Sequence, residues 1–92
     1  MASVKTLPHN QDAEKSVLGA ILIDKDAINL VSEFLLGSDF YDEINAVVFE
    51  AMLKLFEERK AIDLLTVTDF LKKKKQLGTI DSTYFNELVE IV

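Results

Sequence analysis

Few side chains of this sequence could do chemistry, and none stands in a pattern that catalysis or metal binding requires. His9 is the only histidine and cysteine is absent, so a transition-metal site would have to rely on carboxylates alone. The serines, among them Ser16, Ser32 and Ser38, lack the second base that a catalytic dyad or triad needs. We expect no catalytic residue, no cofactor-binding residue and no metal site, and we interpret His9 as a loop residue beside Pro8.

Two pairs of aspartates, Asp24 with Asp26 and Asp39 with Asp42, resemble carboxylate pairs that do acid–base work or bind calcium. Neither pair has the D-x-D-x-D-G spacing and the trailing glutamate of a calcium loop. A general acid also has to be buried, whereas junctions between loops and helices are usually wet. Helix capping and compensation of the helix dipole explain Asp24 and Asp39 more simply.

The run Lys72-Lys73-Lys74-Lys75 is the densest group of charges. Four successive residues of a helix point in four directions, so the run predicts a solvated helix end, with a partner or phosphate contact as the weaker alternative. The sequence has no G-x-x-x-x-G-K-[ST] loop, which excludes nucleotide binding by that route.

Composition indicates one globular domain. The 92 residues are 49% hydrophobic, which is enough for a single core. The N-terminus leads into no signal stretch, and the longest apolar runs are far shorter than the roughly 20 residues of a membrane-spanning helix. We therefore expect a cytoplasmic protein without a membrane contact. The formal charge of −6 disfavours direct binding to nucleic acid.

Hydrophobic periodicity predicts an all-α fold. Apolar residues recur at helical spacing in five stretches, which are Gln11–Ile23, Lys25–Leu35, Glu43–Lys60, a fourth that begins near Thr66 and ends near Gln76, and a fifth that begins near Asp81 or Ser82. Phe40, Tyr41 and Phe49 are predicted to lie in the core.

The expected helix ends carry recognisable capping residues. Asn10 can cap the first helix, with Asp12 and Glu14 at its positive end, and Asp24 can cap the second. Gly37 is predicted to close the second helix in the left-handed conformation. Thr66 with Asp69 is predicted to form a capping box for the fourth.

The apolar pattern of the last helix includes Phe85, Leu88, Val89 and Val92, and the chain stops within this pattern. No Gly, Asn or Pro closes the helix. We expect the chain to be a fragment of a longer protein.

A series of short strings occurs in one order along nearly the whole chain from Leu7. The strings are Leu7-Pro8-His9-Asn10, Ala13-Glu14, Val17-Leu18-Gly19-Ala20, Asp39-Phe40-Tyr41, Val48-Phe49, Ile62-Asp63-Leu64-Leu65-Thr66-Val67, Gln76-Leu77, Tyr84-Phe85 and Glu87-Leu88. Together they closely resemble the N-terminal domain of the hexameric bacterial replicative DNA helicases of the DnaB type.

The resemblance implies an N-terminal arm, residues 1–9, and a helical head domain, residues 10–92, that is a compact orthogonal bundle of about five to six helices. It also implies truncation before a following helical hairpin and a RecA-like ATPase domain that binds ATP and Mg. In this family the head belongs to a collar that pairs subunits within the hexamer and docks primase, and a helicase loader is a further candidate partner. The fragment itself should neither hydrolyse ATP nor unwind DNA.

The chain departs from the family pattern at several positions. Asn45 stands where the family usually has His, and Arg59 and Ala61 stand for a usual Gly and Pro. Asp81-Ser82 replaces a Gly-Gly. Asp and Ser can take over glycine's capping role, but they do not share its tolerance of positive φ.

The resemblance also identifies Asp12 and Tyr84 as candidates for the primase-facing surface. The alternative is that Asp12 only serves the helix dipole and that Tyr84 packs its ring on the edge of the core. For Tyr84 the two interpretations have about equal weight, because an exposed tyrosine is a common interface anchor.

Two other functions fit parts of the sequence. A free-standing regulatory protein that binds helicase or primase would need no motor, and the sequence beyond Val92 would decide between it and a helicase. An acyl or peptidyl carrier protein is also small, acidic and helical, but it needs Ser after Asp at the head of a helix. Gly37-Ser38-Asp39 has the reverse order, and Asp81-Ser82 lies too near the C-terminus.

Overall fold

The protein is described from a computed structural model, which describes residues 11–24, 26–75, 80 and 82–90. Regular structure in these residues is entirely helical: α1 (Gln11–Ile23), α2 (Ala27–Val31), the short 3-10 helix η1 (Gly37–Asp39), α3 (Glu43–Glu57), α4 (Leu64–Lys73) and α5 (Ser82–Glu90). The predicted all-α bundle of about five to six helices is confirmed.

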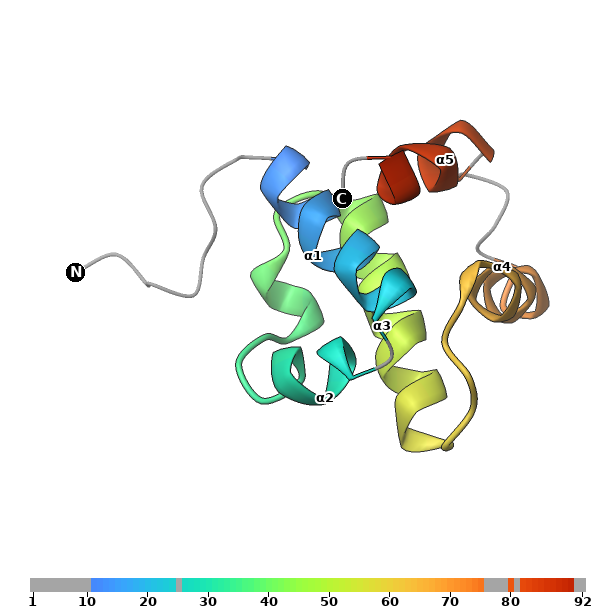
Figure 1. Ribbon diagram of the computed structural model, residues 1–92. Coiled ribbons are helices and arrows are strands. Elements are labelled where there is room, and N and C mark those ends of the chain that lie inside the picture. Colours follow the sequence, from blue (N-terminus) through green and yellow to red (C-terminus); the bar gives the residue numbers. More distant parts are fainter. Residues whose placement is uncertain (1–10, 25, 76–79, 81, 91–92) are drawn as a thin grey trace.

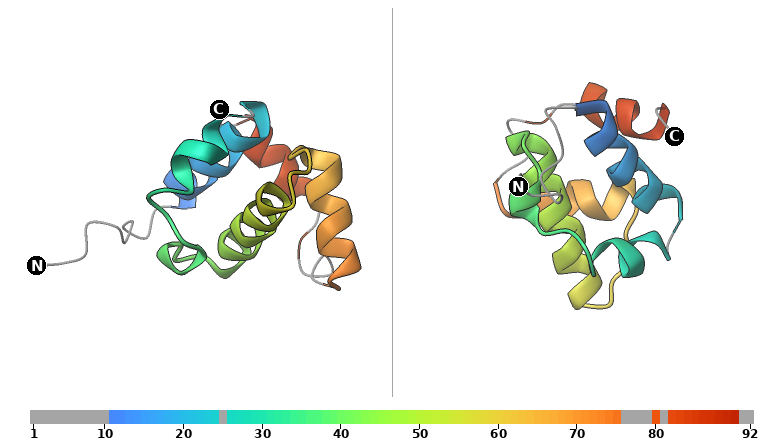
Figure 2. Two further views of the ribbon diagram at one scale, coloured as in Figure 1. Left: turned by 90° about the horizontal axis from the view of Figure 1, so that it is seen from below. Right: turned by 90° about the vertical axis from the view of Figure 1, so that its left-hand side faces the viewer.

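Helix α3 is the centre of the bundle (Figure 1). It packs against α1, α2, η1 and α4, and α1 in turn packs against α5. α1 runs beside α3 in much the same direction, whereas α4 crosses α3 steeply, and α4 and α5 close the side of the bundle that lies away from α2 (Figure 2). α1 and α5, from opposite ends of the sequence, therefore lie side by side.

The core is built from the apolar stripes of these helices. On α3 the buried side chains Val48, Phe49, Met52 and Leu55 follow helical spacing. Leu18, Ile21, Val67, Leu71 and Leu88 are fully buried from the neighbouring helices. Phe40 packs its ring against Phe49 with 4.8 Å between ring centroids, so the turn before α3 is fixed to the core.

The prediction that Tyr41 is a core residue is wrong. Tyr41 is 60% exposed, whereas the adjacent Phe40 is buried, because successive residues of this extended segment point to opposite sides. Val89 is also half-exposed, although Phe85 and Leu88 of the same helix are buried as predicted. Val92, Asp81, His9, the cap Asn10 and the predicted arm 1–9 lie outside the described residues.

The second helix is shorter than predicted. α2 covers Ala27–Val31, and residues 32–34 form turns instead of continuing the helix to Leu35. Asp24 accepts a hydrogen bond from the Asp26 N–H at 2.9 Å, so it forms a local turn and does not cap the helix. Phe34, which continues the helical spacing of the apolar residues Ile28 and Val31, is 63% exposed, because the helix has ended before it.

Gly37 does not close a helix in the left-handed conformation, since no described glycine has positive φ. It instead begins η1, where it is buried next to α3. A Cβ atom there would stand 1.9 Å from the Glu50 carboxylate oxygen Oε2. A larger residue could fit only if the flexible Glu50 side chain moved.

Helix α3 ends three residues before the predicted Lys60. The Lys60 N–H donates to the Leu55 carbonyl at 2.9 Å, and the Arg59 N–H donates to the Phe56 carbonyl at 3.1 Å. This pair of bonds is a Schellman motif, which needs a left-handed residue just after the helix. Arg59 fills that position with φ 60°.

The capping box of α4 lies three residues earlier than predicted. Asp63 accepts from the Thr66 N–H at 2.8 Å, and the Thr66 hydroxyl accepts from the Asp63 N–H at 2.9 Å. The helix therefore begins at Leu64, and Thr66 takes the N3 role of the box instead of the N-cap role. Asp69 instead pairs with Lys73 one turn later, at 3.3 Å.

Candidate functional site

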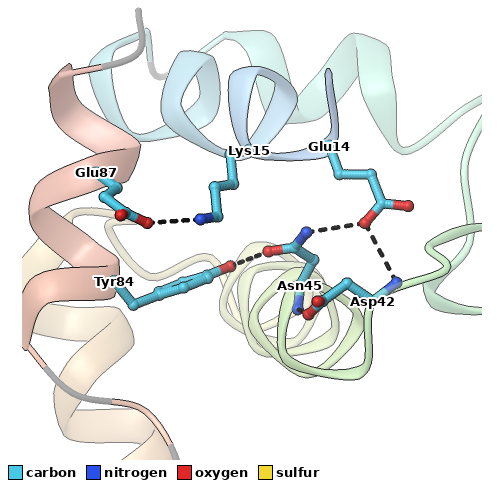
Figure 3. A network of polar contacts seen from close by, with 6 residues as sticks. All are labelled: Glu14, Lys15, Asp42, Asn45, Tyr84 and Glu87. Carbon is cyan, nitrogen blue, oxygen red and sulfur yellow. Dashed lines mark hydrogen bonds and ion pairs between the residues drawn. The ribbon is translucent and has the colours of Figure 1, made fainter. Parts of the chain in front are cut away.

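A buried polar network joins α1, α3 and α5 (Figure 3). The Asn45 amide nitrogen donates to Glu14 Oε1 at 2.8 Å, and the Tyr84 hydroxyl donates to Asn45 Oδ1. Glu14 and Asn45 are 1% and 0% exposed, and Tyr84 is 9% exposed. Every buried polar side-chain atom of the described residues has a hydrogen-bond partner. The network is thus a satisfied part of the interior, which specifies how three helices meet.

Glu14 also fixes the turn that precedes α3. Its two carboxylate oxygens accept from the backbone N–H groups of Tyr41, at 2.7 Å, and of Asp42, at 3.3 Å. The Asp42 side chain in turn caps α3 by accepting from the N–H groups of Ile44 and Asn45. Glu14 of α1 is therefore bonded both to the turn before α3 and to Asn45 in the first turn of α3.

Sequence reasoning missed this network, because it assigned Glu14 only to the helix dipole. A signal was available in the spacing: Glu14 precedes the apolar Val17 and Leu18 by three and four residues, and Asn45 precedes Val48 and Phe49 in the same way. A polar residue on the apolar stripe of a helix has to find a partner inside the core. Two such residues on different helices are candidates for a pair, but the spacing does not show which helices meet.

Tyr84 is the member of the network nearest the surface. Burial raises the pKa of its hydroxyl well above the usual value, and the negative charges of Asp42, Glu14 and Glu87 add to the shift. Its ring packs edge-on against Phe85, with 5.4 Å between centroids. The ammonium group of Lys15 lies 5.5 Å from the centroid of the Tyr84 ring, in reach of a cation–π contact.

Above this network the surface between α1 and α5 is hollowed and charged. Lys15 forms an ion pair with Glu87 at 2.5 Å, which links the two helices (Figure 3). The hollow is lined by Asp12, Lys15, Glu87 and Glu90. We call these four residues the α1–α5 face. It carries three carboxylates and one ammonium group, so it attracts cationic groups of a partner.

The two predicted partner-binding residues lie in this one region. Asp12 is exposed on the α1–α5 face, and Tyr84 is buried below it. The burial of Tyr84 agrees with the alternative in which its ring packs on the edge of the core. A role in partner binding stays a prediction for both residues.

A second hollow lies between α3 and α4. It is lined by Val47, Glu50, Ala51, Leu53, Lys54, Glu57, Phe70 and Lys74. The lysines of the run 72–75 are exposed, as predicted for a solvated helix end, and Lys74 lies over the Phe70 ring.

In the described residues no group of three or more metal-ligating side chains gathers. No helix of that part is long and apolar enough to cross a bilayer.

Comparison of this sequence with known protein families shows to which family the chain belongs. The profile of the DnaB-like helicase N terminal domain matches residues 6–92, which is nearly the whole chain. The chain belongs to this family. The resemblance expected from the ordered strings of the sequence is thereby confirmed.

Curated relatives of this DnaB-like domain are replicative DNA helicases. The chain is 37% identical over 89 residues to the replicative DNA helicase DnaB of Leifsonia xyli subsp. xyli, covering 96% of this chain and 20% of the relative. It is 39% identical over 82 residues to that of Rhodothermus marinus, covering 88% of this chain and 9% of the relative. The chain thus spans a fifth or less of these proteins.

A solved structure agrees with the DnaB-like assignment. The crystal structure of the N-terminal domain of DnaB helicase from Mycobacterium tuberculosis matches with a TM-score of 0.87 and 36% identity. The match covers 92% of this chain and 60% of that structure. Both fold and family therefore agree.

Proposed function

We propose that this chain is the head domain of a replicative DNA helicase and that it docks primase through the α1–α5 face, with no catalysis of its own. Family membership supports the helicase, because the relatives named above are replicative DNA helicases. The observation that carries the docking surface is that Asp12, exposed on the α1–α5 face, and Tyr84, buried below it, lie in one region of the molecule although they are far apart in the sequence.

The test is a calorimetric titration of the chain with the C-terminal helicase-binding region of the cognate primase. We expect a saturable complex that Asp12→Ala and Glu90→Ala weaken, since each removes a carboxylate from the α1–α5 face. Glu33→Ala is the matched control, because Glu33 is an exposed carboxylate in the turn after α2. No heat and no complex at high protein concentration would contradict primase docking.

We also propose that the head associates with a second copy of itself, as part of a hexameric collar. Eight large apolar side chains of the described residues are exposed, and four of them lie between residues 23 and 36. The four are Ile23, Leu30, Phe34 and Leu36. Exposed apolar side chains favour protein contacts.

Light scattering over a concentration series tests self-association. We expect the mass to rise toward that of a dimer, and we expect Phe34→Ser to shift the rise to higher concentration. Leu65→Ser, which removes a more exposed side chain at the start of α4, is the control. A constant monomer mass would contradict the dimer.

The proposed parent protein is expected to carry its motor beyond Val92, on a C-terminal ATPase domain that binds ATP and Mg. Support for this domain comes from the small share of each relative that the chain covers. The proposed location of the parent protein is the cytoplasm. The coding sequence downstream tests for the ATPase domain: a phosphate loop supports the helicase, and a stop codon supports a free-standing regulatory protein that binds helicase or primase. A helicase loader stays a further candidate partner.

A further inference from the structure

Tyr84 is poorly situated to contact a partner directly. Only 9% of the residue is exposed, and its hydroxyl points inward to Asn45 Oδ1 (Figure 3). The Lys15 ammonium group lies over one face of the ring, 5.5 Å from its centroid. Any effect of the Tyr84 hydroxyl on docking must therefore pass through the residues that it orients.

Asn45 connects the three helices through two hydrogen bonds, in one of which it is the donor and in the other the acceptor. Its amide nitrogen faces a carboxylate on α1 and its amide oxygen faces a hydroxyl on α5, while the residue itself lies on α3. A carboxylate can only accept and an amide nitrogen can only donate, so the reversed amide would lose the bond to Glu14. Asn45 thus fixes one orientation of α5 relative to α1.

The α1–α5 face is attached directly to this connection. Lys15 follows Glu14 in the sequence, and Glu87 lies one turn after Tyr84 on α5. The ion pair between Lys15 and Glu87 spans the two helices at 2.5 Å, so it depends on their separation. Because Tyr84 and Glu87 belong to the same helix, a shift of α5 relative to α1 would move Glu87 relative to Lys15 and Asp12.

We propose that Asn45 is a positioning residue for docking: by holding Tyr84 and Glu14, it sets the geometry with which the α1–α5 face meets a partner. This inference rests on the proposed function, because it assumes that the α1–α5 face docks primase. It assigns Tyr84 an indirect role.

A double-mutant cycle tests the inference, with affinity for the primase region measured by calorimetry on fully folded variants. Tyr84→Phe removes only the hydroxyl, and Asn45→Leu removes the amide. We expect each single variant to lose about tenfold in affinity, and the double variant to lose about the same tenfold and not a hundredfold. Circular dichroism melting curves establish that each variant is folded at the temperature of the titration.

Asn45→His provides a rescue control. A neutral imidazole has one donor and one acceptor nitrogen, so it can bridge Glu14 and Tyr84 as the amide does. We expect Asn45→His to bind within about threefold of the parent chain, whereas Asn45→Leu does not. If Asn45→Leu does not fold, the cycle is measured with Asn45→Ser, whose smaller side chain leaves space for water.

Two results would overturn the positioning role while leaving primase docking intact. Additive losses would mean that the Tyr84 hydroxyl contacts the partner independently of Asn45. Lower melting temperatures with unchanged affinity would mean that the network only stabilises the fold. An absence of binding by the parent chain itself is a different result, because it overturns the proposed docking function on which this inference rests.

Discussion

At the scale of single residues, Glu14 shows how a position on a helix decides what a carboxylate does. Asp12 and Glu14 both belong to the first turn of α1, yet Asp12 is exposed and Glu14 is 1% exposed. Glu14 accepts hydrogen bonds from two backbone N–H groups and from the Asn45 amide. A buried acceptor that serves three donors cannot be replaced without leaving a donor unpaired.

Glu14→Gln should lower the free energy of unfolding by about 1–3 kcal/mol, because the amide NH2 of glutamine would face donors that need an acceptor. Denaturant unfolding followed by circular dichroism measures the change. Glu33→Gln, at an exposed position, should change stability by no more than about 0.5 kcal/mol. Equal effects of the two substitutions would contradict the buried role of Glu14.

The raised pKa of Tyr84 makes stability depend on pH in the alkaline range. The unfolded chain releases the tyrosine proton near the usual pKa of about 10, whereas the folded chain still retains it, so stability should fall as pH rises above about 10. In Tyr41→Phe the only remaining tyrosine is Tyr84, and its tyrosinate absorbance reports the titration.

We expect that absorbance to rise together with unfolding and not before it. Tyr41→Phe/Tyr84→Phe is the control, and it should lose less stability over the same pH range. Ionisation of Tyr84 in the folded chain at an ordinary pKa would contradict its burial against Asn45.

At the scale of helices, the caps of α4 give a direct test of where this helix begins. Asp63→Ala should destabilise the chain by about 1 kcal/mol, because it removes the acceptor for the Thr66 N–H. Asp69→Ala should cost no more than about 0.5 kcal/mol, since it removes only an exposed ion pair with Lys73. Thermal unfolding of the two variants measures the difference, and the reverse order would support the capping box predicted from the sequence.

The end of α3 offers a stabilising substitution. Arg59 has φ 60°, a conformation that costs a non-glycine residue roughly 1–2 kcal/mol. Arg59→Gly should raise the free energy of unfolding by about 0.5–1 kcal/mol, because part of the relief is offset by the greater freedom of the unfolded chain.

Lys60→Gly is the matched control, since Lys60 does not have positive φ and should gain nothing from glycine. Chemical denaturation compares the two variants. Arg59→Gly without any gain in stability would contradict the left-handed conformation of Arg59.

Helix prediction from the sequence succeeded where the apolar stripe was long and uninterrupted. α1 has the predicted bounds and α3 the predicted start, because their stripes extend over several turns. It failed at α2, where Phe34 continued the periodicity without being buried. Helix ends depend on backbone hydrogen bonds such as that from Lys60 to Leu55, which apolar spacing does not encode.

The candidate site was predictable only in part. Asp12 and Tyr84 were identified through resemblance, and the structure shows that they lie in one region. Their joint position follows from the packing of α1 on α5, which brings residues from opposite ends of the chain together. Local patterns do not specify which helices pack together, so the role of Asn45 between them required the tertiary structure.

At the scale of the whole molecule, the fold separates its interior from its candidate docking surface. The same two helices supply both, since α1 provides Glu14 inside and Asp12 outside, and α5 provides Tyr84 inside and Glu90 outside. The chain belongs to the family of DnaB-like helicase N terminal domains, and this outer surface is where we propose that it docks primase. The proposed docking function therefore depends on the α1–α5 face.

Docking of primase at the α1–α5 face is tested most directly by an NMR chemical-shift map of the isotopically labelled chain, titrated with the helicase-binding region of primase. We predict that the amide signals of Asp12, Lys15, Glu87 and Glu90 change most, while those lining the hollow between α3 and α4 change little. Shifts confined to that second hollow, or no shifts at saturating primase, would contradict docking at the α1–α5 face.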